Sequence, residues 1–117
     1  MQYMLMVYVD EAKWPAMSKA EQEQGLAAYG AYIEALKQAD VLRASGRLQP
    51  SSASTTVRLA NGRPQVLDGP YAEAREQLGG YFLIDVPNLD AALSWAGRCP
   101  GAAHGVVEVR PIWSMTA

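Results

Sequence analysis

The segment VLDGPYAEAREQLGGYFLID, residues 66–85, places several ionisable side chains between two strand-like runs. Asp68 ends the first run and precedes Gly69-Pro70, where glycine can adopt a positive φ and proline restricts its own φ. A carboxylate held by such a turn at the rim of a cleft can act as a general acid or base. It can instead accept backbone N–H bonds within the turn, so both interpretations of Asp68 stay open.

Glu73, Arg75 and Glu76 follow closely, and their roles depend on the local backbone. If residues 70–78 form a short helix, Glu73 lies beside Glu76. Neighbouring carboxylates raise each other's pKa where water is scarce, which keeps a protonated acid available near neutral pH; in open solvent they do not. We expect Glu76 on a solvated face, Glu73 as a candidate catalytic residue lining the cleft, and Arg75 as a candidate substrate contact.

His104 is the single histidine and stands directly before the last strand-like run. Because its unperturbed pKa lies near neutrality, it is a candidate proton shuttle if the fold brings it to Asp68, and otherwise a surface group. On the following run Glu108 and Arg110 share one face by the period of two. They are expected to pair at a dimer interface, or Arg110 can bind an anionic ligand through its planar guanidinium.

Aromatic and sulfur-containing side chains mark a further candidate binding surface. Tyr8 and Tyr81, together with Met4 and Met6, would give a cavity on a sheet face an apolar lining suited to a small organic ligand. The same side chains would serve equally as the core of an interface between subunits.

Composition and charge argue against several function classes. With one cysteine, Cys99, and one histidine, the chain has no intramolecular disulfide and no usual zinc site, and it contains no cofactor or metal motif. The formal net charge is −2 and the ten Lys and Arg residues form no basic run, so nucleic acid is not an expected partner. We find no signal peptide and no apolar run long enough to cross a membrane, and we expect a cytoplasmic protein.

The elements that must position these side chains follow from the hydrophobic pattern. Strand-like runs rich in apolar and β-branched residues lie at 2–9, 41–50, 80–86 and 105–113. Between the second and third of these, Asn61-Gly62 joins two β-prone runs, which predicts an inserted hairpin.

Two helices are predicted between these strands. The first, residues 18–38, begins at a capping box formed by Ser18 and Glu21. Its core-facing stripe is expected to consist of Leu26, Tyr29, Ile33 and Leu36. The second helix follows Asn88 and ends before Pro100. The resulting order of elements is that of an α+β, ferredoxin-like split βαβ fold with an inserted β-hairpin.

This fold predicts a partner for the sheet. The first strand is apolar on both faces, and two helices can cover only one of them. A second copy of the chain is the simplest cover for the other face, so we expect a homodimer.

The segment DGPYAEAREQLGGYFLID resembles the signature of the DGPF family, a branch of the YCII-related proteins. The resemblance extends to QYMLMVY at the start, SSASTTVRLANGRPQVLDGP before the signature, LDAALSWAGRCP after it and GVVEVRP near the end. It therefore predicts a single domain over residues 1–117. Tyr71 stands where the family name has Phe, which keeps the ring and adds a hydroxyl, and makes Tyr71 a candidate ligand contact.

The resemblance implies a dimeric α+β barrel, in which two ferredoxin-like sheets face each other. The family is mostly of unestablished activity, and related genes often lie beside extracytoplasmic-function sigma factors. We expect a cleft that binds a small, largely apolar organic molecule, with cofactor-independent acid–base chemistry as a possible activity. The alternative is a non-catalytic regulatory or partner-binding module, linked to a sigma factor or another regulator.

Overall fold

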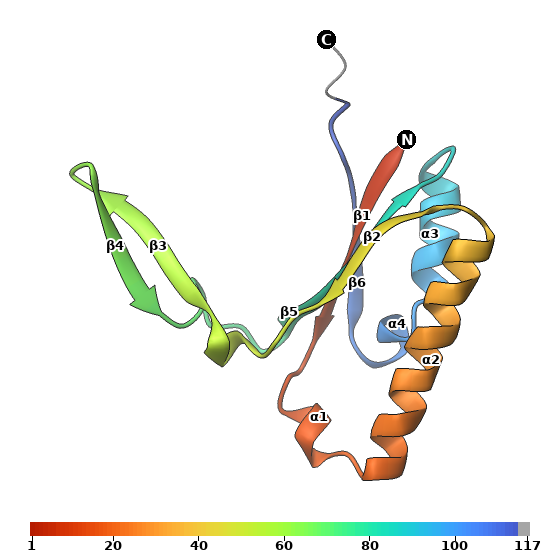
Figure 1. Cartoon of the computed structure of the whole chain (residues 1–117), viewed down its shortest axis with the longest axis horizontal. Coiled ribbons are helices and arrows are strands. Elements are labelled where there is room, and N and C mark those ends of the chain that lie inside the picture. The colour runs from red at the N-terminus through yellow and green to blue at the C-terminus, as the bar shows by residue number, and fades with distance from the viewer. Residues whose placement is uncertain (115–117) are drawn as a thin grey trace.

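The computed structural model describes residues 1–114 of the chain (Figure 1). The strands are β1 Gln2–Val9, β2 Leu42–Arg47, β3 Thr55–Ala60, β4 Arg63–Asp68, β5 Gln77–Asp85 and β6 Val106–Pro111. The helices are α1 Lys13–Ala16, α2 Lys19–Gln38, α3 Leu89–Arg98 and α4 Gly101–His104, and a 3₁₀ turn, η1, spans Ser51–Ala53. No helix within residues 1–114 is long and apolar enough to span a membrane.

Four strands form one antiparallel sheet in the order β2-β5-β1-β6. Figure 1 shows α2 and α3 on the same face of this sheet. Strands β3 and β4 pair only with each other and form a separate two-stranded sheet. The predicted α+β fold class is confirmed: the chain forms a ferredoxin-like sheet with an inserted hairpin.

The hydrophobic core lies between the sheet and the helices. Along β1 the buried side chains Tyr3, Leu5 and Val7 alternate with partly exposed ones, as the period of two requires. The remaining buried core residues are Tyr32, Leu36, Phe82, Ile84, Val86, Ala92, Ala96 and Cys99. The hydroxyl of Tyr32 donates a 2.8 Å hydrogen bond to the carbonyl of Trp95 on α3, so this buried phenol keeps a polar partner.

Helix α2 begins as predicted but faces the core differently. Ser18 and Glu21 form both hydrogen bonds of the capping box. The predicted stripe is wrong at Leu26, which is 50% exposed, and it omits Tyr32, which is buried. The physical reason is that the first part of α2 lies beyond the sheet, next to α1 (Figure 1), where the Trp14 ring lies close to Gly25.

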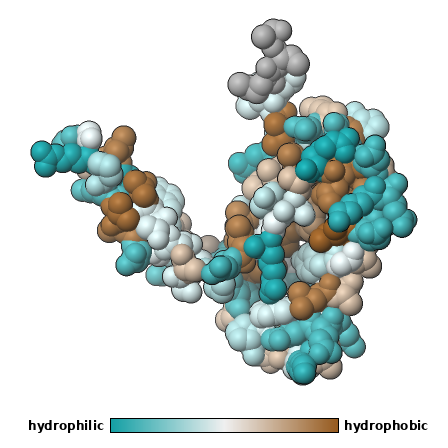
Figure 2. Space-filling model, in the orientation of Figure 1, coloured by the Kyte–Doolittle hydropathy of each residue, from teal (hydrophilic) through white to brown (hydrophobic). Residues whose placement is uncertain are grey.

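Strands β3 and β4 form an arm, residues 55–68, that stands away from the rest of the subunit (Figures 1 and 2). Its turn is the predicted one: Asn61 and Gly62 have φ values of 52° and 76°, the left-handed pair that a two-residue hairpin turn needs. The arm gives the subunit a radius of gyration of 16.3 Å, compared with about 13.4 Å expected for a compact chain of this length.

Candidate functional site

The face of the sheet opposite the helices carries an apolar surface, and none of the helices in residues 1–114 lies over it. We call this surface the open face and define it by Met4, Met6, Tyr8, Tyr81 and Leu83. All five side chains are partly exposed, and they alternate along β1 and β5 with the buried core residues. The register places Met4 opposite Leu83 and Met6 opposite Tyr81. The predicted candidates Tyr8 and Tyr81 therefore lie on one continuous surface.

Tyr81 owes its position to Gly46 on the neighbouring strand β2. The two residues are paired in the register, and a Cβ on Gly46 would lie 2.8 Å from Cε1 of the Tyr81 ring. The ring can lie over β2 only because Gly46 has no side chain. Sequence reasoning missed Gly46, although a glycine inside a strand is itself a signal of close approach.

Charged groups lie beside the open face on the edge strand β6. Arg110 is opposite Met4 and Glu108 is opposite Met6. The predicted ion pair is present, with Arg110 Nη2 donating to Glu108 Oε2 at 2.6 Å. Both side chains are substantially exposed, at 67% and 41%, so the pair adds little stability. It places a guanidinium where it can reach a ligand on the open face.

The root of the arm, where β4 ends, holds Asp68. The turn after it is fixed by two hydrogen bonds: Gly69 N–H donates to the Ser54 carbonyl at 2.7 Å, and Thr56 Oγ1 donates to the Gly69 carbonyl at 2.8 Å. Gly69 has a φ of 103°, which favours glycine. No hydrogen bond within residues 1–114 uses the Asp68 carboxylate, so it does not cap this turn and remains available to a ligand or solvent.

Asp68 and Tyr71 border the same hollow, of about 280 Å³. It is lined by Thr56, Arg58, Gln65, Leu67, Asp68, Pro70 and Tyr71. The Arg58 guanidinium lies 5.4 Å from the centre of the Tyr71 ring, a cation–π distance. Tyr71 is 77% exposed. This hollow is therefore open to water.

Glu73 borders a second hollow at the root, of about 400 Å³. It is lined by Ser51, Ser52, Pro70, Ala72, Glu73, Ala74 and Gln77. The short helix considered for residues 70–78 is not formed, since residues 71–76 are irregular and β5 begins at Gln77. Glu73, Arg75 and Glu76 are all exposed, so helical spacing does not bring the two carboxylates together.

Gln77 and Glu11 explain why this segment is irregular. Gln77 pairs with Val9 of β1, and its side-chain amide donates to the Ala74 carbonyl. Its Oε1 accepts from the Glu11 N–H at 3.1 Å. These bonds commit the backbone around Gln77 to the sheet instead of a helix.

Glu11 is a residue of the root that sequence reasoning missed. Its carboxylate accepts from both the N–H and the Oγ of Ser51, each at 2.7 Å. It thereby ties the end of β1 to the turn η1 that leads into the arm. The contact spans 40 residues of sequence, and no local pattern indicates it.

His104 and Asp68 lie in different parts of the subunit. His104 is exposed at the end of α4, which lies on the helix-covered side of the sheet, whereas the arm stands on the other side (Figure 1). Within this chain the two side chains therefore do not form an acid–base pair. The other candidates fall into two groups: Tyr8, Tyr81 and Arg110 at the sheet, and Asp68, Tyr71, Glu73 and Arg75 at the root of the arm.

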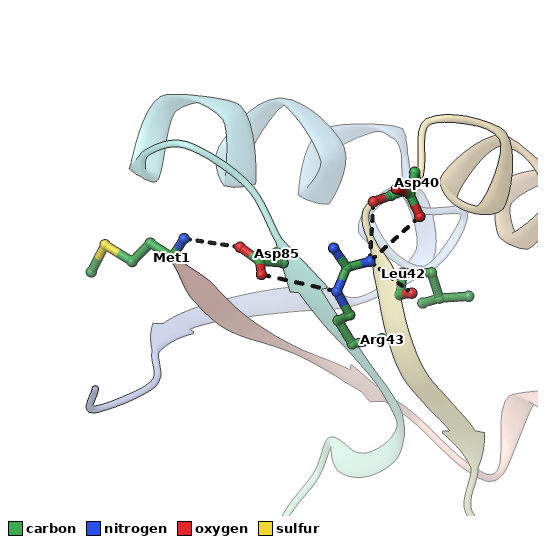
Figure 3. Close-up of polar contacts among 5 residues, drawn as sticks. All are labelled: Met1, Asp40, Leu42, Arg43 and Asp85. Carbon is green, nitrogen blue, oxygen red and sulfur yellow. Dashed lines mark hydrogen bonds and ion pairs between the residues drawn. The ribbon is translucent and has the colours of Figure 1, made fainter. Parts of the chain in front are cut away.

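The far end of the sheet carries a separate polar cluster (Figure 3). The N-terminal amino group donates to Asp85 at 2.9 Å, and Arg43 Nε lies 3.9 Å from the same carboxylate. The hydrogen bond from the N-terminus lowers the pKa of Asp85. This cluster joins β1, β2 and β5 at the opposite end from the arm, and it has a structural role.

The one thiol lies in the core. Cys99 is 2% exposed, and burial raises its pKa, which disfavours the reactive thiolate. Within residues 1–114 no three His, Cys, Asp or Glu side chains lie together as ligands for a metal ion.

Comparison with known proteins gives the family. The family model described as the YCII-related domain matches residues 1–116. An uncharacterised protein of Rhizobium meliloti (strain 1021) is 39% identical over 114 residues, covering 96% of this chain and 92% of the relative. Among solved structures, 5-chloro-2-hydroxyhydroquinone dehydrochlorinase (TftG) from Burkholderia phenoliruptrix AC1100, in complex with 2,5-dihydroxybenzoquinone, aligns with a TM-score of 0.56. That alignment covers 97% of this chain and 94% of TftG at 14% identity, so it shows a shared fold. The chain belongs to the YCII-related domain family.

Proposed function

We propose that the chain acts as a cytoplasmic homodimer in which two open faces meet and enclose a cavity for a small, largely apolar organic molecule. The observation that carries this proposal is the open face itself. Its methionine, leucine and tyrosine side chains lie on a sheet without helix cover, beside the guanidinium of Arg110. An apolar lining with a few placed polar groups is what small-molecule sites usually have.

The amount of exposed surface supports a dimer. The subunit exposes 8346 Å², whereas a compact monomer of 12.7 kDa would expose about 6,200 Å². The difference of about 2,100 Å² exceeds the roughly 800 Å² that each partner buries in a standard interface. A twofold axis brings identical surfaces of two copies together, so we expect the open face of one copy to pack on the open face of the other.

The chemistry of the open face favours a ring with polar substituents. Methionine and leucine suit a flat apolar ring, the hydroxyls of Tyr8 and Tyr81 can bond ring oxygens, and Arg110 can hold an acidic oxygen. The TftG structure contains such a ligand, 2,5-dihydroxybenzoquinone. At 14% identity this likeness does not transfer an activity, but it makes that quinone a reasonable first probe.

Asp68 and Glu73 are the candidates for acid–base chemistry, which would need no cofactor. Both carboxylates border hollows at the root of the arm, and the Asp68 carboxylate has no partner within residues 1–114. A carboxylate that is free of internal bonds can take a proton from a bound substrate. A non-catalytic binding module remains the alternative, and it would bind ligand without turnover.

Calorimetric titration with 2,5-dihydroxybenzoquinone tests the binding site. We expect Arg110→Gln to weaken binding by about tenfold or more, because it removes a charge-assisted hydrogen bond. Arg98→Gln is the matched control, since Arg98 lies over the Trp95 ring on α3 and should leave binding unchanged. Equal affinity in wild type and Arg110→Gln would place the ligand elsewhere.

Turnover and assembly are separate readouts. Faster exchange of the quinone's ring hydrogens for deuterium in the presence of wild type, but not of Asp68→Asn, would support a catalytic role for Asp68 as the group that moves a proton. Binding without turnover in both proteins would favour the binding module. Sedimentation as a monomer at high protein concentration would contradict the dimer.

A further inference from the structure

The arm carries an apolar surface that the described part of the chain, residues 1–114, leaves exposed. Val57 is opposite Val66 and Leu59 is opposite Pro64 in the register, so the period of two places all four on one face. We call these four residues the arm's apolar face. Val57, Leu59 and Val66 are 62%, 68% and 61% exposed. Isolated apolar residues on a surface are ordinary, but a contiguous exposed face on a projecting hairpin indicates a contact surface.

The arm also needs a partner for its own stability. Its two strands pair only with each other, and a two-stranded hairpin by itself is at best marginally stable in water. Its ties to the rest of the subunit lie at its root, through Ser54, Gly69 and the Glu11–Ser51 bonds. Within residues 1–114 no other strand pairs with them, so we expect a surface that packs against the strands themselves to come from outside the subunit.

The direction of the arm indicates where that surface comes from. Figure 1 shows the arm leaving the sheet on the side away from α2 and α3, which is the side of the open face. Figure 2 shows clear space between the arm and the body of the subunit. A second copy that covers the open face would occupy this space and would lie directly beside the arm.

We propose that each arm packs its apolar face on the second copy of the chain, so that the two subunits embrace each other and each arm closes one end of the shared cavity. This inference rests on the proposed homodimer and adds to it a specific contact. The Asp68 side chain, at the root of one arm and on the same face of β4 as Val66, then borders a cavity completed by the partner subunit.

Two observations favour a second copy over another kind of partner. The first is charge: on this face of the arm Asp68, at the root, is the one ionisable group that continues the row of Pro64 and Val66, and the charged groups beside the open face, Glu108 and Arg110, neutralise each other. A nucleic acid or a highly charged protein would find no complementary field there. The second is area, because one symmetric partner can cover the open face and the arm together, which suits an excess of about 2,100 Å².

Photo-crosslinking tests the contact directly. The protein carries p-benzoylphenylalanine in place of Leu59, and normal and isotopically heavy copies are refolded together before irradiation. We expect crosslinked peptides that join a light arm to a heavy body, and the reverse. The matched control places the same group at Arg58, which is adjacent in β3 but on the opposite face, and should give far fewer such pairs.

Sedimentation gives a second, independent readout. The triple variant Val57→Ser, Leu59→Ser, Val66→Ser should raise the dimer dissociation constant by at least about tenfold, because apolar contacts at an interface core carry much of its affinity. The triple variant Thr56→Ser, Arg58→Ser, Gln65→Ser alters the opposite face of the arm and should raise the constant much less. Circular dichroism checks that the four-stranded sheet, whose strands do not pair with the arm, stays folded.

The outcomes separate this inference from the dimer. A wild-type monomer would overturn both. If the wild type is a dimer and the apolar triple variant has the same dissociation constant, the arm contact alone would be overturned. So would crosslinks confined to single copies, which would mean that the arm folds back on its own sheet, and so would an absence of crosslinks, which would mean that the arm stays in water.

Discussion

Replacing Leu36 by Ala tests the placement of the core. Leu36 lies in α2, is fully buried at 0% exposure, and belongs to the cluster between the helices and the sheet. Truncation removes its buried methyl groups and leaves a cavity in a closely packed region. Both effects act in the same direction and reduce the free energy of unfolding.

The expected magnitude follows from this burial. Leu→Ala changes at fully buried sites cost about 2–5 kcal/mol, and we expect about 3 kcal/mol for Leu36. Leu26, in the same helix, is 50% exposed, so only about half of the free energy of burying a leucine side chain stabilises the fold there. Full burial of a leucine is worth about 1.5–3 kcal/mol, and half of that range gives a cost of about 1 kcal/mol for Leu26→Ala.

Urea unfolding followed by circular dichroism measures both variants. The protein concentration is kept the same throughout, because dimerisation would couple association to stability. The slope of the free energy against urea should stay unchanged, so that the midpoint reports stability alone. Both substitutions replace leucine by a slightly better helix former, and the difference between them therefore reports packing.

A result in which Leu26→Ala costs as much as Leu36→Ala would refute the reasoning. It would mean that α2 presents the stripe expected from its sequence and that the N-terminal part of the helix is covered. A cost below about 1 kcal/mol for Leu36→Ala would equally contradict a closely packed core.

Two further predictions concern backbone space and pH. A Cβ at Gly105 would lie 2.1 Å from the Tyr8 carbonyl oxygen, so Gly105→Ala should lower the free energy of unfolding by about 3 kcal/mol. Gly30 in α2 has open space around it, so Gly30→Ala should raise the free energy of unfolding by about 0.5–1 kcal/mol. Thermal unfolding measures both variants, and equal effects would contradict the packing. Burial raises the pKa of Tyr29 to about 12 and raises that of Tyr32 as well. Because the pKa of each phenol is higher in the folded than in the unfolded state, folding favours the neutral phenol. The stability that this contributes is fully present below the unfolded pKa of about 10. It is lost as the pH rises through about 12, so ultraviolet titration should show these phenols ionising together with unfolding, and ionisation without unfolding would contradict their burial.

Local chemistry in the sequence predicted most of the elements correctly. Ser18 and Glu21 cap α2 through bonds within four consecutive residues, and Asn61-Gly62 sets the arm's turn because both residues tolerate a positive φ. The two-sided apolar pattern of β1 predicted a sheet with one face left uncovered by the helices. Each of these signals acts over a few residues and needs no knowledge of the rest of the chain.

The structure departs from local preference where a distant contact overrides it. The short helix considered for residues 70–78 does not form, because pairing of Gln77 with β1 holds the segment in an irregular path. The stripe in α2 was wrong at Leu26 because a helix pattern does not say where the sheet ends. Both outcomes arise because the periodicity of a helix or strand is unaffected by what lies beside it.

The candidate site residues also divide into those that the sequence identified and those that only the tertiary structure brought together. Sequence alone singled out Asp68, Tyr71 and Arg110 by residue type and position, and it placed Glu108 beside Arg110 by the period of two. Only the tertiary structure seated Tyr81 over Gly46, tied Glu11 to Ser51, and put His104 and the arm on opposite sides of the sheet. The sequence directly gives the residue types and their short spacings. These determine which chemical groups are available and how residues that are close in the sequence lie relative to one another. Which groups meet depends on strand order and register, since these are set by long-range pairing whose energy is shared among the whole core.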